Sequence, residues 1–323
     1  MYLRLPAHLV ALALLLADPQ GAPPQQQPVF RAGVETVAVY ATVTNRAGEL
    51  VRNLTRDDFQ VFDNGVLQSL TVFENSIQPI TAILLVDTSA SMAPTLDFAR
   101  QAAEQFVIRM MPGDRARVGS FSDRIDLTQE FTGNRDELLL ALREKLHIGN
   151  PTRLWDALDE TMNALADSGG RRVAVLFTDG EDTASGVAGR DVLERAKADD
   201  LMIYAVQIRS RAVPGIERQI LGPAPRTAPP PRGAPTPTQI LRGLAGQSGG
   251  LHFALNQNDD VNATFTQVAF ELRHQYLLGF TPARLDGGIH ELEVRTRNDR
   301  LTVRARKFYE APRSPARGPE RRR

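Results

Sequence analysis

The chain has 323 residues, enough for about two domains, and 42% of them are hydrophobic, so it can form buried cores. Lys plus Arg and Asp plus Glu each number 38, and the resulting formal net charge of zero excludes bulk attraction to nucleic acid or to an anionic membrane. Cysteine is absent, which excludes disulfides, thiol nucleophiles, cysteine-ligated zinc and a cysteine-linked lipid anchor.

The first 28 residues have the order of a secretory signal peptide followed by a linker. A basic start at Arg4 precedes an apolar run over residues 9–17, and a Pro/Gln-rich stretch continues to Pro28. The apolar run is much shorter than the ~20 residues that a helix needs to cross a bilayer. We therefore expect a secreted, periplasmic or cell-envelope protein with no stable membrane span.

Short alternating strands are predicted near both ends of the chain. Near the N-terminus they cover residues 34–43, 59–63 and 66–73, and the Asn64-Gly65 pair predicts a hairpin with a type I′ turn. Near the C-terminus they cover residues 276–280, 288–296 and 301–308. Because a few strands are not stable alone, we predict one small, discontinuous, β-sandwich-like domain made of residues 29–78 and 276–310.

Between these ends, residues 79–275 alternate strands with helices. Strands are predicted at 80–86, 116–121, 172–177, 201–208 and 250–255, and helices at 95–111, 134–146, 153–167, 188–199, 239–247 and 259–274. This order predicts an α/β fold, a doubly wound and mainly parallel sheet flanked by helices, inserted into the β domain.

Two biased segments stand apart from this pattern. Residues 211–238 are rich in Pro and Arg, which predicts a flexible insertion; it is either a tolerated surface excursion or a basic arm near the ligand face. Residues 311–323 carry five Arg against Glu320, and we expect a disordered basic tail.

Oxygen-bearing side chains follow the predicted buried strands, where ligand sites of open α/β sheets lie. Asp87, Ser89 and Ser91 come directly after the strand 80–86, and Asp179 follows the strand 172–177. Thr152 precedes a predicted helix. In an extended turn, alternate residues can direct their oxygens toward one centre.

Two carboxylates and three hydroxyls form an all-oxygen donor set, which hard divalent cations prefer. Mg²⁺ is the expected ion, with Mn²⁺ or Ca²⁺ as alternatives. The donor set is too small to enclose the ion, so a coordination position stays open for a partner's carboxylate.

At these residues the sequence resembles the von Willebrand factor type A domain and its metal-ion-dependent adhesion site, which combines Asp-x-Ser-x-Ser with a distant Thr and a distant Asp. The resemblance covers about residues 80–275, and the two ends are similar to a group of bacterial secreted proteins that hold such a domain in a β-rich frame. It implies that Ser89, Ser91 and sometimes Thr152 bind the ion directly, while Asp87 and Asp179 act mainly through waters. Two positions depart from the pattern: Ala90 replaces a frequent Gly, and Pro151 precedes the Thr.

The residues after Asp179 form a predicted rim of Gly180, Glu181 and Asp182. Gly180 permits a sharp turn, and the two acids are either solvated or able to tune the metal or contact a basic partner. The loops around 93–96, 149–153 and 184–190 are expected to govern partner choice.

The preferred function is an exported, adhesion-type module in which Mg²⁺ coordinates an exposed Asp or Glu of a protein or peptide ligand. The alternative is a structural envelope protein whose site is degenerate or only stabilising. An enzyme is not expected, because the Gly-Lys-Ser/Thr phosphate loop, the Gly-x-Ser-x-Gly elbow and a positioned base are all missing from the sequence. No nucleic-acid partner is expected, and the sequence leaves the oligomeric state open.

Overall fold

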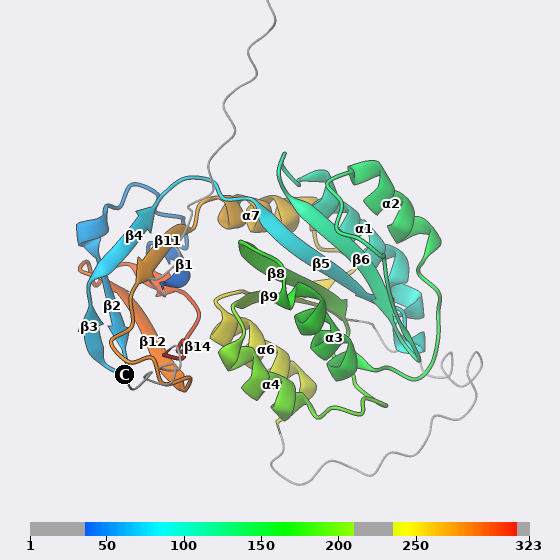
Figure 1. Ribbon diagram of the computed structural model, residues 1–323. Helices are drawn as coiled ribbons and strands as arrows, with labels where there is room; N and C mark the ends of the chain where they lie inside the picture. The colour runs from blue at the N-terminus through cyan, green and yellow to red at the C-terminus, as the bar shows by residue number, and fades with distance from the viewer. Residues whose placement is uncertain (1–35, 210–234, 315–323) are drawn as a thin grey trace, which may run out of the picture. The chain divides into compact units, whose positions relative to one another are not determined.

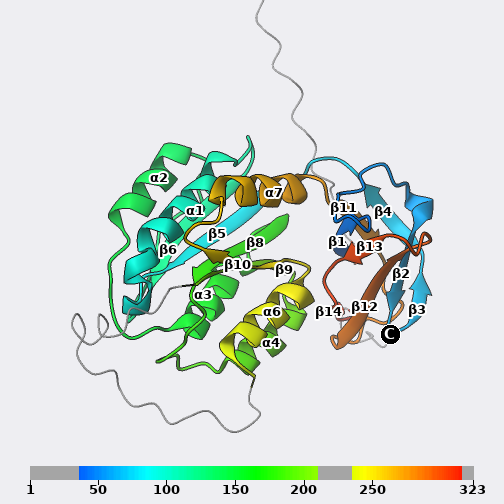
Figure 2. The ribbon, with the colours of Figure 1, turned by 180° about the vertical axis from the view of Figure 1, so that it is seen from behind.

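The computed structural model describes residues 36–209 and 235–314 (Figures 1 and 2). The residues of these two ranges belong to one compact unit. The predicted signal and linker over 1–28, residues 211–234 of the predicted insertion 211–238 and residues 315–323 of the predicted tail 311–323 lie outside the described residues. The described ends of the last two segments are ordered, because residues 237 and 238 begin a helix and Ala311 is buried with its N–H donating to the Gly288 carbonyl. Within the described part, no helix is long and apolar enough to cross a membrane.

A six-stranded sheet forms the centre of the α/β part, with the strand order β10-β9-β8-β5-β6-β7. Its strands are β5 (Ile80–Asp87), β6 (Arg115–Phe121), β7 (Ile125–Leu127), β8 (Arg171–Thr178), β9 (Leu201–Arg209) and β10 (His252–Asn256). All neighbouring pairs are parallel except β6 and β7, which form an antiparallel hairpin at the sheet edge. The mainly parallel, doubly wound sheet predicted from the sequence is confirmed. The short strand β7 was not predicted, because three residues show no clear alternation.

Helices cover both faces of this sheet (Figure 1). They are α1 (Leu96–Ile108), α2 (Arg135–Glu144), α3 (Leu154–Ala166), α4 (Gly189–Ala198), α6 (Pro237–Ser248) and α7 (Val261–Arg273). One core contains apolar side chains of α1, α2 and α7, and the other contains those of α3, α4 and α6. The strands of the sheet supply residues to both cores, so β5 and β8 are nearly continuous apolar runs.

Two four-stranded antiparallel sheets lie outside the central sheet, with orders β13-β1-β11-β4 and β14-β12-β2-β3. Their strands are β1 (Val37–Thr44), β2 (Phe59–Asp63), β3 (Val66–Gln68), β4 (Leu70–Glu74), β11 (Tyr276–Phe280), β12 (Ile289–Thr296), β13 (Thr302–Arg304) and β14 (Phe308–Glu310). Residues of both sheets share a single hydrophobic core. Each sheet combines strands from both ends of the chain, as the sequence predicts.

The hairpin between β2 and β3 has the predicted turn, because Asn64 and Gly65 both have positive φ angles of 46° and 78°. The second predicted strand, 66–73, is divided: β3 pairs with β2, whereas β4 pairs with β11 in the other sheet. The predicted strand 301–308 is likewise divided into β13 and β14, one in each sheet. Strands that change sheets keep their alternation, so the sequence pattern does not reveal the break.

Candidate metal centre

Asp87 is the last residue of β5 and its side chain is fully buried. One carboxylate oxygen accepts the Ser89 backbone N–H at 2.9 Å, and the other accepts the Thr178 hydroxyl at 2.6 Å. Thr178 ends the neighbouring strand β8, and its own hydroxyl oxygen accepts the Gly180 N–H at 2.9 Å. The carboxyl ends of β5 and β8 are therefore joined through the Asp87 carboxylate.

The second candidate carboxylate, Asp179, directly follows β8 and lies close enough to Asp87 for the two charges to repel. Burial, and then the negative charge of Asp179, raise the pKa of Asp87 to about 7, although hydrogen bonds from Ser89 and Thr178 oppose the rise. Asp179 is held by the Glu181 N–H, which donates to its carboxylate at 3.0 Å. The site thus places two carboxyl groups close together, and the one on Asp87 is shielded from water.

The two serines of the predicted motif lie together at the carboxyl end of β5. The hydroxyl oxygens of Ser89 and Ser91 are 3.1 Å apart. The sequence predicts an extended turn here, but the chain forms a 3-10 helix over Ala90–Thr95 with Ser89 as its extended N-cap residue. Asn64 is the one residue other than Gly with a positive φ in the described ranges, so the backbone at Ala90 does not require the Gly that is frequent at this position.

Thr152 belongs to a loop that runs beside the serine segment. Gly149 forms a parallel bridge with Ser89, and its N–H donates to the Thr88 carbonyl at 3.0 Å. The following Asn150–Pro151 peptide is cis. Thr152 is buried, and its N–H donates to the Thr183 hydroxyl at 2.9 Å. Its carbonyl accepts the N–H groups of residues 183 and 184. This loop therefore lies between the serine segment and the loop that follows Asp179.

The rim residues have different surroundings. Gly180 has a φ of 91°, and a Cβ there would lie 2.9 Å from the side-chain nitrogen of Gln207, so this position requires glycine. Gln207 also donates to the Asp179 carbonyl at 2.8 Å. Glu181 is exposed. Asp182 is half-buried, and burial raises the pKa of its carboxyl group against the opposing hydrogen bonds from Ser185 and Leu154.

Asp182 and Ser185 cap the N-terminus of α3 from a distant part of the chain. The Asp182 carboxylate accepts the Leu154 N–H at 2.9 Å, and the Ser185 hydroxyl accepts the N–H groups of Trp155 and Asp156 at 3.0 and 3.2 Å. These groups satisfy the first helical N–H donors, because the N-cap residue Arg153 offers no side-chain cap. Sequence reasoning missed this role, since the capping residues follow the helix by about thirty positions.

The structure therefore brings Asp87, Ser89, Ser91 and Asp179 to one edge and places the loop of Thr152 beside them. Among the residues that the structure describes, no group of three or more His, Cys, Asp or Glu side chains is arranged to hold a metal ion. The candidate centre differs from such a group, because only two of its five donors are carboxylates and the other three are hydroxyls.

The fold is an open α/β sheet with an oxygen-rich edge at the carboxyl ends of its central strands. In sequence comparisons, residues 82–181 match the von Willebrand factor type A domain. Residues 82–181 therefore belong to a von Willebrand factor type A domain, and two small antiparallel sheets lie outside it. A comparison with curated proteins found no match.

Several solved structures are similar to this chain. A von Willebrand factor type A protein from Catenulispora acidiphila is 10% identical, with 88% of this chain and 76% of that chain covered and a TM-score of 0.48. An aerotolerance-related membrane protein from Bacteroides fragilis is 15% identical, with 60% and 98% covered and a TM-score of 0.45. Proximal thread matrix protein 1 of the mussel byssus, whose adhesion-site motif is occupied by zinc, is 13% identical, with 64% and 48% covered and a TM-score of 0.47.

Proposed function

We propose that this protein is an exported, metal-dependent binding module. A divalent cation, Mg²⁺ in the first instance, is held by Ser89, Ser91, Thr152 and the carboxylates of Asp87 and Asp179, and an acidic side chain of a protein partner completes its coordination. The observation that carries the proposal is the Asp87 carboxylate, which is fully buried beside Asp179 and has no cationic side chain among its hydrogen-bond partners in the described structure.

The donor set suits such an ion. Two carboxylates balance the charge of a divalent cation, and bringing the cation close removes the repulsion that raises the pKa of Asp87. The paired hydroxyls of Ser89 and Ser91 offer neutral oxygen ligands, which hard cations accept. When bound, the ion supplies Lewis-acid attraction for a carboxylate of the partner. The chain's own part is to hold the oxygens and leave one side accessible.

The family supports binding rather than catalysis, because von Willebrand factor type A domains are mainly non-catalytic and often bind proteins through such a site. Export is supported by the order of the first 28 residues, with a basic start, a short apolar run and a Pro/Gln-rich stretch. We also propose that residues 29–78 and 276–310 form the frame around a von Willebrand factor type A domain over 79–275.

A thermal titration tests the metal site. The melting temperature of residues 29–323 is measured after chelation and then with increasing Mg²⁺ or Mn²⁺. The same titration is made on the site variants Asp87→Asn and Asp179→Ala and on the control Asp167→Ala, which alters an exposed acid at the end of α3. A specific ion stabilises the native state by about 2.7 kcal/mol at 100 times its Kd. The wild type and the control should show a saturable rise that both site variants lack.

The partner is sought next by affinity capture with Mg²⁺ or with chelator. An acidic ligand that binds in Mg²⁺ only, and not to Asp179→Ala, supports the proposal. Equal melting of all variants at every metal concentration would contradict it and favour a structural envelope role.

A further inference from the structure

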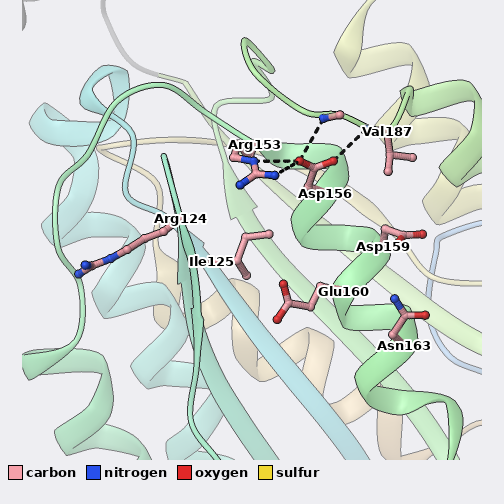
Figure 3. A pocket seen from close by; sticks show the side chains of 9 residues that line it. Arg124, Ile125, Arg153, Asp156, Asp159, Glu160, Asn163 and Val187 are labelled. Atoms are coloured by element: carbon pink, nitrogen blue, oxygen red, sulfur yellow. Dashed lines mark hydrogen bonds and ion pairs between the residues drawn. The ribbon is translucent and has the colours of Figure 1, made fainter.

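A polar pocket lies beside the candidate metal centre, between the edge strand β7 and one face of α3 (Figure 3). Its volume is about 530 Å³. Asp156, Glu160 and Asn163 line it from α3, at spacings of four and three residues that place them on one helix face. Arg153, the N-cap residue just before the helix, lines it as well. Ile125 of β7 provides apolar surface in the same pocket.

Residues that line the pocket directly follow residues of the candidate metal centre or of the loop beside it. Arg153 directly follows Thr152, so the top of the helix face adjoins the proposed ligand loop. On the other side, Arg124 follows Asp123, whose carboxylate packs so closely on Gly149 that a Cβ at Gly149 would meet it at 2.2 Å. This adjacency brings the pocket within reach of a polypeptide bound at the metal.

Most charges in the pocket already have partners within the protein. Asp156 accepts hydrogen bonds from the N–H groups of Gly186 and Val187 and forms an ion pair with Arg153 at 2.7 Å. Partial burial opposes them, but these groups lower the pKa of Asp156 and keep it ionised. Asp159 forms an ion pair with Arg195 at 2.6 Å.

Arg124 forms an ion pair with Asp126 at 2.7 Å. Glu160 differs, because within residues 36–209 and 235–314 no cation or hydrogen-bond donor contacts its exposed carboxylate. The pocket thus offers one uncompensated negative charge next to an apolar side chain, Ile125.

We propose that this pocket binds a lysine or arginine side chain of the partner, on the same segment as the acid at the metal. Lys and Arg fit because their methylene groups can lie on Ile125 while the cation reaches Glu160. A carboxylate or a purely apolar side chain would leave Glu160 uncompensated. This inference rests on the proposed function and adds the chemical class of the ligand: an acidic residue and a basic residue at a fixed separation.

The separation follows from the helix. Glu160 lies six positions after Leu154, the first residue of α3, which is about 9 Å along the axis at 1.5 Å per residue. An extended peptide advances about 3.3 Å per residue, so the basic residue should lie about three positions from the acid.

A random 12-residue peptide library displayed on phage tests the inference on the full chain in Mg²⁺. Parallel selections use the wild type, Glu160→Lys, Asp179→Ala and Glu144→Lys, which makes the same charge change on an exposed residue of α2. The wild type and Glu144→Lys should enrich an acid with Lys or Arg about three positions away. Glu160→Lys should keep the acid and lose the base.

A synthetic peptide from the wild-type selection then measures the contact. Replacing its basic residue by norleucine should weaken binding to the wild type about three- to tenfold, whereas the affinity of the Glu160→Gln protein should be the same for both peptides. Enrichment of the acid alone, or of a base that Glu160→Lys retains, would overturn the inference and leave the proposed function intact. No enrichment in the wild type beyond that in Asp179→Ala would overturn both.

Discussion

A buried carboxylate next to a second one is unfavourable unless something compensates it, and Asp87 is such a residue. Two hydrogen bonds, from the Ser89 N–H and the Thr178 hydroxyl, stabilise its charged form only in part, since its pKa is still raised to about 7. The metal-free protein therefore keeps a proton on Asp87 at pH values where the unfolded chain has released it.

This difference predicts the pH dependence of the metal-free protein. The unfolded chain binds fewer protons than the native state between the ordinary pKa of 3.8 and about 7, so stability falls as the pH rises through this window. For a shift of this size the loss is roughly 4 kcal/mol over the whole window, of which roughly 3 kcal/mol falls above pH 5. Urea unfolding in chelator at pH 5 and pH 8 should show a fall in the wild type that Asp87→Asn largely removes.

Adding Mg²⁺ should raise the free energy of unfolding of the wild type more at pH 8 than at pH 5, because the ion binds the ionised carboxylate. Equal pH slopes for wild type and Asp87→Asn in chelator would show that another group controls the dependence.

Gly65 gives a second residue-scale prediction, because only its backbone angle requires glycine. Gly65 and Gly169 both have open space where a Cβ would be placed, but only Gly65 has a positive φ, of 78°. Gly65→Ala should destabilise the protein by about 1 kcal/mol, whereas Gly169→Ala should be neutral or slightly stabilising. Urea midpoints of the two variants measure the difference. Equal effects would contradict the type I′ requirement at Asn64-Gly65.

At the scale of elements, α3 depends on a loop that is distant in sequence. Its first N–H groups donate to Asp182 and Ser185, and Asp156 in its first turn accepts from the same loop. The contacts are reciprocal, so the helix that follows Thr152 and the loop that follows Asp179 hold each other in place.

Ser185→Ala should destabilise the protein by about 1 kcal/mol, since it leaves the N–H groups of Trp155 and Asp156 without their acceptor. Ser168→Ala is the control, because the Ser168 hydroxyl makes no side-chain hydrogen bond within the described part of the chain. Chemical unfolding compares the two. The same Ser185→Ala protein should bind Mg²⁺ more weakly, and unchanged stability together with unchanged affinity would refute the coupling.

These elements also show how far the sequence alone can lead. The long strands and all six described helices are predictable because periodicity and length distinguish them. The Asn64-Gly65 turn is predictable because its local chemistry determines it. The division of residues 66–73 between two sheets is not, since alternation is the same in either sheet. The cap from Ser185 and the Gln207 contact with Gly180 are tertiary, and no local pattern encodes them.

For the whole molecule, the α/β part and the antiparallel sheets meet through buried polar groups. The Arg171 guanidinium, at the start of β8, donates to the Leu272 carbonyl and to the Gln275 side chain, and Gln275 donates to the Thr42 hydroxyl at 2.6 Å. Burial lowers the pKa of Arg171, and its hydrogen bonds replace the water contacts that a buried guanidinium loses. Farther along, the Glu271 carboxylate accepts from Tyr204 at 2.7 Å and pairs with Arg304 of β13.

Because β11 follows α7 after only two residues and Gln275 links it to β1 and β8, we expect the two parts to unfold together. The chain has one Trp, Trp155 in α3, so its fluorescence reports on the α/β part, whereas far-UV circular dichroism reports on all sheets and helices. Coincident urea transitions by both probes are expected for the wild type.

Gln275→Ala leaves Arg171 without one acceptor. It should lower the free energy of unfolding by about 2 to 3 kcal/mol and shift the midpoints of both probes to lower urea, whereas Gln101→Ala on the exposed side of α1 should not. Separate transitions in the wild type would show that the buried junction does not join the parts, and a Gln275→Ala loss confined to circular dichroism would show that it supports only the antiparallel sheets.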